Sequence, residues 1–218
     1  MFEIIDLTRR LTKQTLQFPG ERPGLVTVAA DLGRPEARLT HVAHLDLHLG
    51  THMDAPLHFI PGGADIASLA LALRWAVVVR TREREIPPSV LPAHSLRDCA
   101  VLFDTGWAIE AESPAYFEGF PYLSPKTAAE LVNRGAGLIG IDSPSADPVD
   151  SDLECPAHHA LLGAGIPIVE GLCNLDRLPD GARRVWFAAF PLKLEDVEGS
   201  PVRAVALLPA PNEAQRRR

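Results

Sequence analysis

Three histidines and one aspartate are concentrated in residues 48–59, and this segment constrains the chain more than any other. It reads His-Leu-Gly-Thr-His-Met-Asp-Ala-Pro-Leu-His-Phe, with His48, His52, Asp54 and His58 all at even positions. Successive side chains of an extended chain point to opposite sides, so these four can converge on one pocket while the odd positions face the core. The glycine and the proline within the segment disfavour a helix. The sequence therefore predicts a strand that runs into a turn.

These residue types indicate a metal site. Imidazole nitrogen and carboxylate oxygen atoms are ligands for zinc, manganese or iron, and a site without thiolates usually leaves room for water and substrate. The alternative is a histidine-rich turn whose imidazoles are surface groups or hydrogen-bonded core residues. A single histidine would fit that alternative, but four such groups at even positions favour a metal site.

The composition is that of a globular protein. Of the 218 residues 46% are hydrophobic and 22% charged, which predicts one domain over residues 1–210 and a solvated tail at residues 211–218. The net charge of −7 argues against a nucleic-acid surface. Neither a signal peptide nor a membrane span is expected, because the longest apolar stretch, residues 67–79, contains an arginine and is too short. Three widely separated cysteines favour a reducing, cytoplasmic setting.

Short apolar runs separated by turn residues predict strands along most of the chain. These strands are expected at residues 2–7, 25–30, 40–48, 76–80, 100–104, 138–141, 166–170, 185–192 and 201–208. A helix should start at Pro125, with Ser124 as its N-cap, and stop at Gly135. A shorter helix is predicted over residues 158–162. The order strand, helix, strand predicts an α/β fold with a mixed or partly parallel sheet.

A second group of candidate ligands lies far along the chain. His158 or His159 is on the short predicted helix, and Glu170 ends the following strand, where Gly171 permits close approach of the backbone. A carboxylate can bridge two metals, so Asp54 and Glu170 could together hold a pair of ions. Alone, Glu170 would be an ordinary carboxylate at a strand end. Taken together with the segment at residues 48–59, Glu170 indicates a site built from two distant parts of the chain.

Five motifs extend over nearly the whole chain. They are His-x-Gly-Thr-His-x-Asp-x-Pro-x-His-Phe at 48–59, Ile-Asp-Ser-Pro-Ser at 141–145, His-His-Ala-Leu-Leu at 158–162, Ile-Val-Glu-Gly-Leu at 168–172 and Ser-Pro-Val-Arg-Ala-Val at 200–205. Together they resemble the metal-dependent cyclase family, which includes arylformamidases and isatin hydrolases. The resemblance implies a swivelling β/β/α domain with a mixed sheet and a homodimer. It also implies one or two zinc ions, with manganese as the alternative.

The resemblance further implies roles for the candidate residues. The metal ligands would be His48, His52, Asp54, His158 and Glu170. The family spacing selects His158 over His159, and it makes His58 the proton donor and acceptor. A ligand role for His58 stays open, because every imidazole in such a cluster can bind metal.

Phe18 precedes a predicted turn at residues 18–21, and the residues alone leave it either a pocket wall or a core residue. The family's formamidases carry a substrate-contacting tryptophan at this position. The resemblance therefore implies that Phe18 binds substrate.

The leading functional hypothesis is hydrolysis of an aryl formamide, namely N-formylkynurenine to kynurenine and formate in tryptophan breakdown. The metal would activate water, and His58 would pass a proton to the departing nitrogen. One alternative is a hydrolase that opens a cyclic amide or lactone such as isatin, and another is a non-catalytic metal- or ligand-binding protein. Asp142 and Ser143 follow a strand but stay outside the catalytic set, because an Asp-Ser-Pro turn needs no function to explain it.

Overall fold

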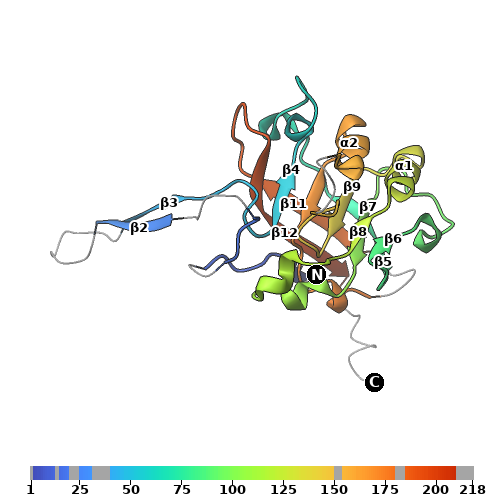
Figure 1. Ribbon diagram of the computed structural model, residues 1–218, viewed down its shortest axis with the longest axis horizontal. Helices are drawn as coiled ribbons and strands as arrows, with labels where there is room; N and C mark the ends of the chain where they lie inside the picture. The colour runs from blue at the N-terminus through green and yellow to red at the C-terminus, as the bar shows by residue number, and fades with distance from the viewer. Residues whose placement is uncertain are drawn as a thin grey trace.

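A computed structural model describes residues 2–12, 15–19, 25–30, 40–149, 154–179 and 185–209. Its main feature is an eight-stranded sheet in the order β1-β12-β11-β5-β7-β9-β10-β4 (Figure 1). The strands are β1 (Phe2–Asp6), β4 (His52–Asp54), β5 (Arg74–Arg80), β7 (Ala100–Asp104), β9 (Leu138–Ile141), β10 (Ile168–Glu170), β11 (Val185–Pro191) and β12 (Gly199–Pro209).

The sheet closes on itself through its shortest strand. β4 pairs antiparallel with β10 on one side and with Gly199–Pro201 of β12 on the other. All strands of this sheet except β1 therefore form a closed ring, while β1 pairs with the far part of β12. The neighbouring pairs β5–β7, β7–β9 and β9–β10 are parallel, and the other pairs of this sheet are antiparallel. The predicted mixed α/β class is confirmed, the closure was not predicted, and the swivelling description stays a prediction.

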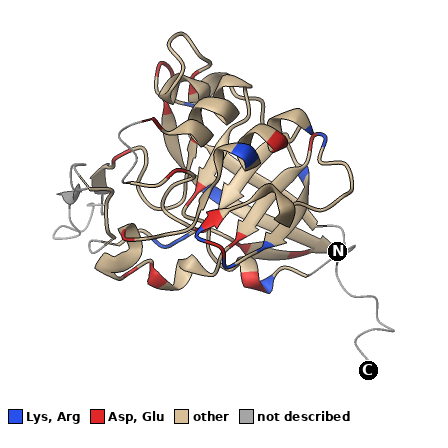
Figure 2. Cartoon of the chain, turned by 45° about the vertical axis from the view of Figure 1, so that its right-hand side comes forward, with Lys and Arg blue, Asp and Glu red and all other residues tan. Residues whose placement is uncertain are grey.

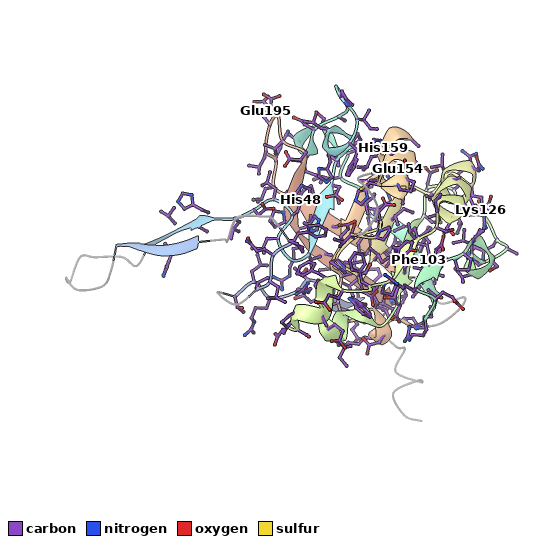
Figure 3. The ribbon with its side chains drawn as sticks, viewed as in Figure 1. His48, Phe103, Lys126, Glu154, His159 and Glu195 are labelled. Carbon is purple, nitrogen blue, oxygen red and sulfur yellow. The ribbon has the colours of Figure 1, made fainter. Side chains whose placement is uncertain are left out.

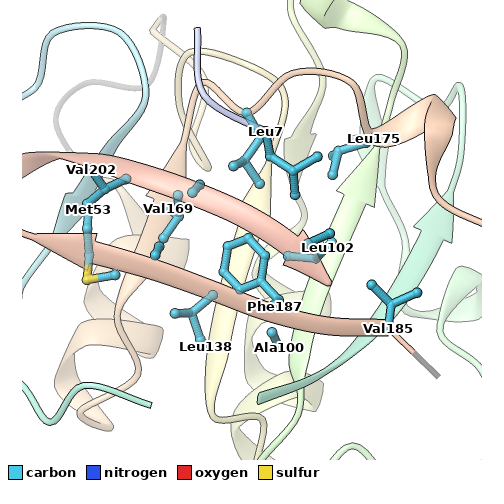
Figure 4. Packing of buried hydrophobic residues seen from close by; sticks show 14 of the residues in the cluster. Leu7, Met53, Ala100, Leu102, Leu138, Val169, Leu175, Val185, Phe187 and Val202 are labelled. Atoms are coloured by element: carbon cyan, nitrogen blue, oxygen red, sulfur yellow. The ribbon is translucent and has the colours of Figure 1, made fainter. Parts of the chain in front are cut away.

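Two hydrophobic cores lie on opposite faces of this sheet. In β7, Ala100 and Leu102 belong to the core inside the ring, whereas Val101 and Phe103 belong to the core under the helices. Figure 4 shows Leu102, Phe187 and neighbouring apolar side chains of the inner core. Because side chains alternate along a strand, a strand buried on both faces must be apolar throughout. This explains the uninterrupted apolar run at residues 100–103.

The helices α1 (Pro125–Asn133) and α2 (Pro156–Gly163) lie on the same side of the sheet (Figure 1). Both contribute buried residues to the outer core, among them Leu131 and Leu161. In addition, 3-10 helices occur at Pro56–His58, Ile66–Ser68, Pro88–Val90, Trp107–Glu110, Pro114–Phe117 and Leu175–Arg177. Both predicted helices are thus confirmed.

Two small sheets complete the description. β2 (Leu25–Ala30) and β3 (Thr40–His44) form an antiparallel pair that extends away from the barrel in Figure 1. β6 (Glu85–Ile86) and β8 (Tyr122–Leu123) form a parallel pair that the sequence did not predict.

One strand prediction was wrong. The strand expected over residues 40–48 ends at His44, and a turn leads from Asp46 to Gly50. Leu45 is 39% exposed, so the alternating leucines do not form a buried face. The predicted turn at residues 18–21 is described only as far as Pro19, and the tail at residues 211–218 lies outside the described residues.

Charged residues are dispersed over the body of the protein. In Figure 2, Lys and Arg alternate with Asp and Glu, and the described part of this view shows no continuous basic stripe. None of the described helices combines the length and the apolar character needed to cross a membrane.

The N-cap of α1 supports a stability prediction. The Ser124 hydroxyl accepts a hydrogen bond from the Thr127 backbone N–H at 3.1 Å, and the two hydroxyls lie 2.9 Å apart. Ser124→Ala should therefore destabilise the fold by about 1 kcal/mol, which lowers Tm by about 2–4 °C. Ser124→Thr retains the cap and serves as the control in thermal unfolding. An unchanged Tm for Ser124→Ala would show that the cap is energetically unimportant.

Candidate metal centre

Strand pairing brings the two predicted halves of the site together. His52 and Asp54 are the first and last residues of β4, and His52 is the register partner of Glu170 at the end of β10. His48 lies in the preceding turn, and Figure 3 shows it beside β4. His58 ends the 3-10 helix that follows β4. The segment is thus a turn, a short strand and a helical turn. The sequence predicted a strand that runs into a turn, and the observed strand is limited to His52–Asp54.

Imidazole groups surround the two carboxylates. His52 Nε2 lies 3.5 Å from Asp54 Oδ1 and 3.4 Å from Glu170 Oε2. His158 Nε2, from α2, lies 3.5 Å from Asp54 Oδ2 and 3.2 Å from Glu170 Oε1. His48 Nδ1 lies 2.9 Å from Asp54 Oδ1. The structure therefore brings all five predicted ligands into one cluster.

The cluster fits a metal ion. The potential ligand atoms of His48, Asp54 and His58 lie within 4.8 Å of one another, and so do those of His52, Asp54 and Glu170. Asp54 belongs to both groups and is fully buried. Imidazoles approach its carboxylate oxygens, but none of the described residues gives either oxygen a well-aligned hydrogen bond. Burying such a carboxylate is costly, and a cation among these ligands would offset the cost.

Hydrogen bonds orient two of the imidazoles. His52 Nδ1 lies 3.1 Å from the Gly50 carbonyl, which can only accept, so Nδ1 carries the proton and Nε2 faces the carboxylates. His158 Nδ1 lies 2.7 Å from Asp147 Oδ2, so its Nε2 is likewise free for metal. The Ala146 N–H donates to Glu170 Oε1 at 2.7 Å and holds that carboxylate.

Burial and neighbouring charges shift the pKa values of His48 and Asp54. Burial lowers the pKa of His48, but its contact with Asp54 outweighs burial and raises the pKa to about 9. Burial raises the pKa of Asp54, but His158 and His48 outweigh it and hold this pKa well below its usual range. These shifts pair a protonated His48 imidazole with the Asp54 carboxylate, so a metal ion that binds to His48 must displace a proton.

Asp147 is a site residue that the sequence did not reveal. Besides contacting His158 Nδ1, its carboxylate accepts the backbone N–H groups of Ala157 and His158 at 3.0 and 2.9 Å. It therefore fixes both the start of α2 and the ring of His158. An aspartate eleven residues before the ligand gives little signal in sequence, because helix geometry makes the contact.

Asp147→Asn should weaken zinc affinity by about 10- to 100-fold, because the amide cannot accept all three hydrogen bonds of the carboxylate. Competition with a chelator would measure the zinc Kd. Asp98→Asn, an exposed position with φ of 58° that asparagine tolerates, is the matched control. An unchanged Kd for Asp147→Asn would remove Asp147 from the support of the site.

A cavity of about 210 Å³ opens above the cluster. Its aromatic lining consists of Phe18, Phe59, Tyr116 and Phe117. Phe18 contacts Phe117 edge to face, with 5.6 Å between ring centroids. The structure thus places Phe18 on the wall of the cavity, and its contact with substrate stays a prediction.

Asp142 holds the segment that carries part of this wall. Its buried carboxylate accepts the backbone N–H groups of Thr105 and Gly106 at 3.0 and 2.9 Å. These bonds fix the start of the loop that leads to Tyr116 and Phe117. Asp142 thus acts on the cavity through the loop. The sequence could not reveal this, because the contact joins residues 36 and 37 positions apart that only the tertiary structure brings together.

Comparisons with known proteins identify relatives over most of the chain. The Cyclase family model, described as "Putative cyclase", matches residues 5–148. Kynurenine formamidase of Geobacillus thermodenitrificans (strain NG80-2) is 33% identical over 92% of this chain and 95% of that protein. Kynurenine formamidase of Salinibacter ruber (strain DSM 13855 / M31) is 35% identical over 93% of this chain and 96% of that protein.

Solved structures share the fold. Isatin hydrolase A from Labrenzia aggregata, bound to benzyl benzoate, superposes with a TM-score of 0.83 at 24% identity, covering 95% of this chain and 94% of that one. An isatin hydrolase bound to the product analogue thioisatinate gives a TM-score of 0.82 at 24% identity, covering 95% and 93%. At this identity the likeness bears on the fold alone.

Proposed function

Because the chain belongs to the Cyclase family, we propose that it is a metal-dependent hydrolase of aryl formamides, with N-formylkynurenine as its substrate. The observation that carries this proposal is the buried Asp54 carboxylate, which lies among imidazoles beneath an aromatic-walled cavity. Curated relatives named kynurenine formamidase, which match more than nine-tenths of the chain, support the choice of substrate.

The proposed metal ligands are His48, His52, Asp54, His158 and Glu170, which would hold one or two ions. We expect zinc, with manganese as the alternative, since imidazole and carboxylate ligands suit both. A divalent ion bound there would polarise the formyl carbonyl and lower the pKa of water.

The aromatic side chains would position the aryl ring. Phe18 and Phe117 present apolar surfaces above the cluster, and ring contacts of this kind favour edge-to-face or offset geometry. A bound aryl group would also exclude bulk water from the reacting amide, which strengthens the interactions of the developing charge.

His58 would move the proton. Its ring stacks on His48 with 4.3 Å between centroids, and it lines the cavity. Burial lowers the pKa of His58, so its imidazole is neutral at pH 7 and able to accept a proton from water. It would then donate this proton to the anilinic nitrogen as the C–N bond breaks.

Opening of a cyclic amide such as isatin is the second candidate. It is favoured by the isatin hydrolase structures, which share the fold over 95% of this chain. The same ligand cluster and the same His58 would serve that reaction.

Steady-state kinetics with both substrates tests the proposal. Metal-free protein would be reconstituted with zinc or with manganese and assayed with N-formylkynurenine and with isatin. We expect metal-restored turnover with a higher kcat/KM for the formamide. Turnover of isatin alone would transfer the assignment to cyclic amides, and turnover of neither would refute both.

Several expectations from the sequence stay proposals. We propose a homodimer in the cytoplasm, a role in tryptophan breakdown, a single domain over residues 1–210 and the swivelling β/β/α arrangement of the family. Sedimentation analysis of the metal-loaded protein tests the dimer.

A further inference from the structure

Arg9 is the one arginine or lysine among the described residues that line the cavity above the metal ligands. Its backbone is tied to both halves of the site. The Arg9 N–H donates to the Thr51 hydroxyl at 2.9 Å, and this hydroxyl donates to the Gly171 carbonyl at 2.6 Å. Thr51 precedes β4 and Gly171 follows β10, so Arg9 is held at a fixed place beside the ligand cluster.

The guanidinium of Arg9 is oriented but not neutralised. Its Nη2 donates to the Ala111 carbonyl at 2.6 Å, and its Cζ lies 4.5 Å from the centroid of the Tyr116 ring. Both partners are uncharged, and in the described part of the chain no carboxylate forms an ion pair with Arg9. A guanidinium has five N–H donors in a planar fork, so donors remain for an anionic ligand.

Arg9 also borders a second, wider cavity of about 580 Å³. The residues that line this cavity are mixed, with the polar Arg10, Thr12, Thr15 and Glu112 beside the apolar Ala108, Ile109 and Ala111. Arg9 therefore lies where an aromatic pocket over the metal ligands meets a second space that offers polar side chains. A ligand that occupies both must have an aryl part and a polar side chain, and its anionic group would meet Arg9.

We propose that Arg9 determines specificity by binding a carboxylate on the side chain of an aryl substrate. This inference rests on the proposed function and narrows it to aryl formamides that carry a carboxylate. Guanidinium and carboxylate match in a two-pronged geometry, which gives direction as well as charge. Isatin has no carboxylate, so Arg9 favours the formamide over the cyclic amide.

A pair of substrates that differ only in this carboxylate tests the role of Arg9. N-formylkynurenine carries it, and N-formylkynuramine is the same aryl formamide without it. Arg9→Met should lower kcat/KM for N-formylkynurenine by about 10- to 100-fold, mainly through KM, because a charge-assisted interaction is lost. Turnover of N-formylkynuramine should stay within about threefold of the wild-type value. Arg9→Lys should restore part of the loss, because it keeps the charge without the fork.

Arg97→Met is the matched control. Arg97 is exposed and precedes the amino end of β7, whereas the cavity lies beyond the carboxyl end of β10. Arg97→Met should leave kcat/KM unchanged for both substrates. Equal losses on both substrates with Arg9→Met would mean that Arg9 only supports the wall, and unchanged kinetics would also overturn the proposal.

Binding of the products separates this inference from the proposed function. If no formamide is hydrolysed, the proposed function fails, and calorimetry with kynurenine and kynuramine still tests Arg9. Kynurenine should bind more tightly than kynuramine to the wild type, and Arg9→Met should remove the difference. Equal binding of the two compounds to the wild type, or binding of neither, would overturn the role of Arg9.

Discussion

Replacing Asp54 with asparagine should remove the metal and lower kcat/KM by at least about a thousandfold, because several kcal/mol of stabilisation depend on the ion. Asp54 belongs to both groups of potential ligand atoms, and His48, His52 and His158 all contact its carboxylate. Asparagine keeps the size of the side chain but supplies one neutral oxygen in place of a charged pair. Changing a residue that only orients a metal ligand typically costs about 10–100-fold in affinity, so the loss of this shared ligand should exceed about 100-fold.

Metal content by mass spectrometry, measured with kcat/KM, checks this result. Asp65→Asn is the matched control, because Asp65 is a half-buried residue outside the cavity lining, and its carboxylate accepts hydrogen bonds from the Ser68 and Asp196 backbone N–H groups. It should retain full metal content and activity. A fully loaded Asp54→Asn variant would show that Asp54 is not a ligand.

His58→Ala should keep the metal and lower kcat by about 100- to 10,000-fold, the range expected when a proton-transfer group is removed. The expectation follows from the position of His58 on the cavity wall, where it stacks against His48. His159→Ala is the matched control, because His159 is exposed and its ring contacts Phe59 from outside the cavity lining. Metal content and kcat would be measured for both variants.

The two measurements separate the roles of His58. Loss of kcat with metal retained supports proton transfer. Loss of metal would instead assign His58 as a ligand, which the closeness of its nitrogen atoms to His48 and Asp54 permits. Full turnover would remove His58 from the mechanism. If His58→Ala left every measured property unchanged and the wild type showed no turnover, a non-catalytic binding protein would be favoured.

The sequence predicted those elements whose burial or capping can be inferred from their own residues. The run at Ala100–Asp104 matched β7 because a strand buried on both faces must be apolar along its length. Ser124 and Pro125 marked the start of α1 because capping depends on local backbone geometry. The strand prediction over residues 40–48 was wrong for the converse reason. The alternation of leucines resembles a half-buried strand, but Leu45 is exposed and packs against no core.

Features that depend on distant partners could not be predicted. The closure of the barrel requires the three-residue strand β4 to meet residues 199–201, and nothing local specifies this pairing. The ligand cluster was found because three of its residues, His48, His52 and Asp54, are close in sequence. Asp147 and Arg9 were missed because tertiary structure alone places them beside His158 and the cavity.

The double pairing of β4 also bears on the order in which the chain is synthesised and folds. The strand that bears His52 and Asp54 finds one neighbour in residues 168–170 and the other in residues 199–201. During synthesis, His52 and Asp54 therefore leave the ribosome long before the two segments that pair with their strand. Contacts between segments so far apart in sequence form slowly. A metal ion at the proposed site would therefore find its complete set of ligands only after residues 168–170 have paired with β4, and it would stabilise a late stage of folding.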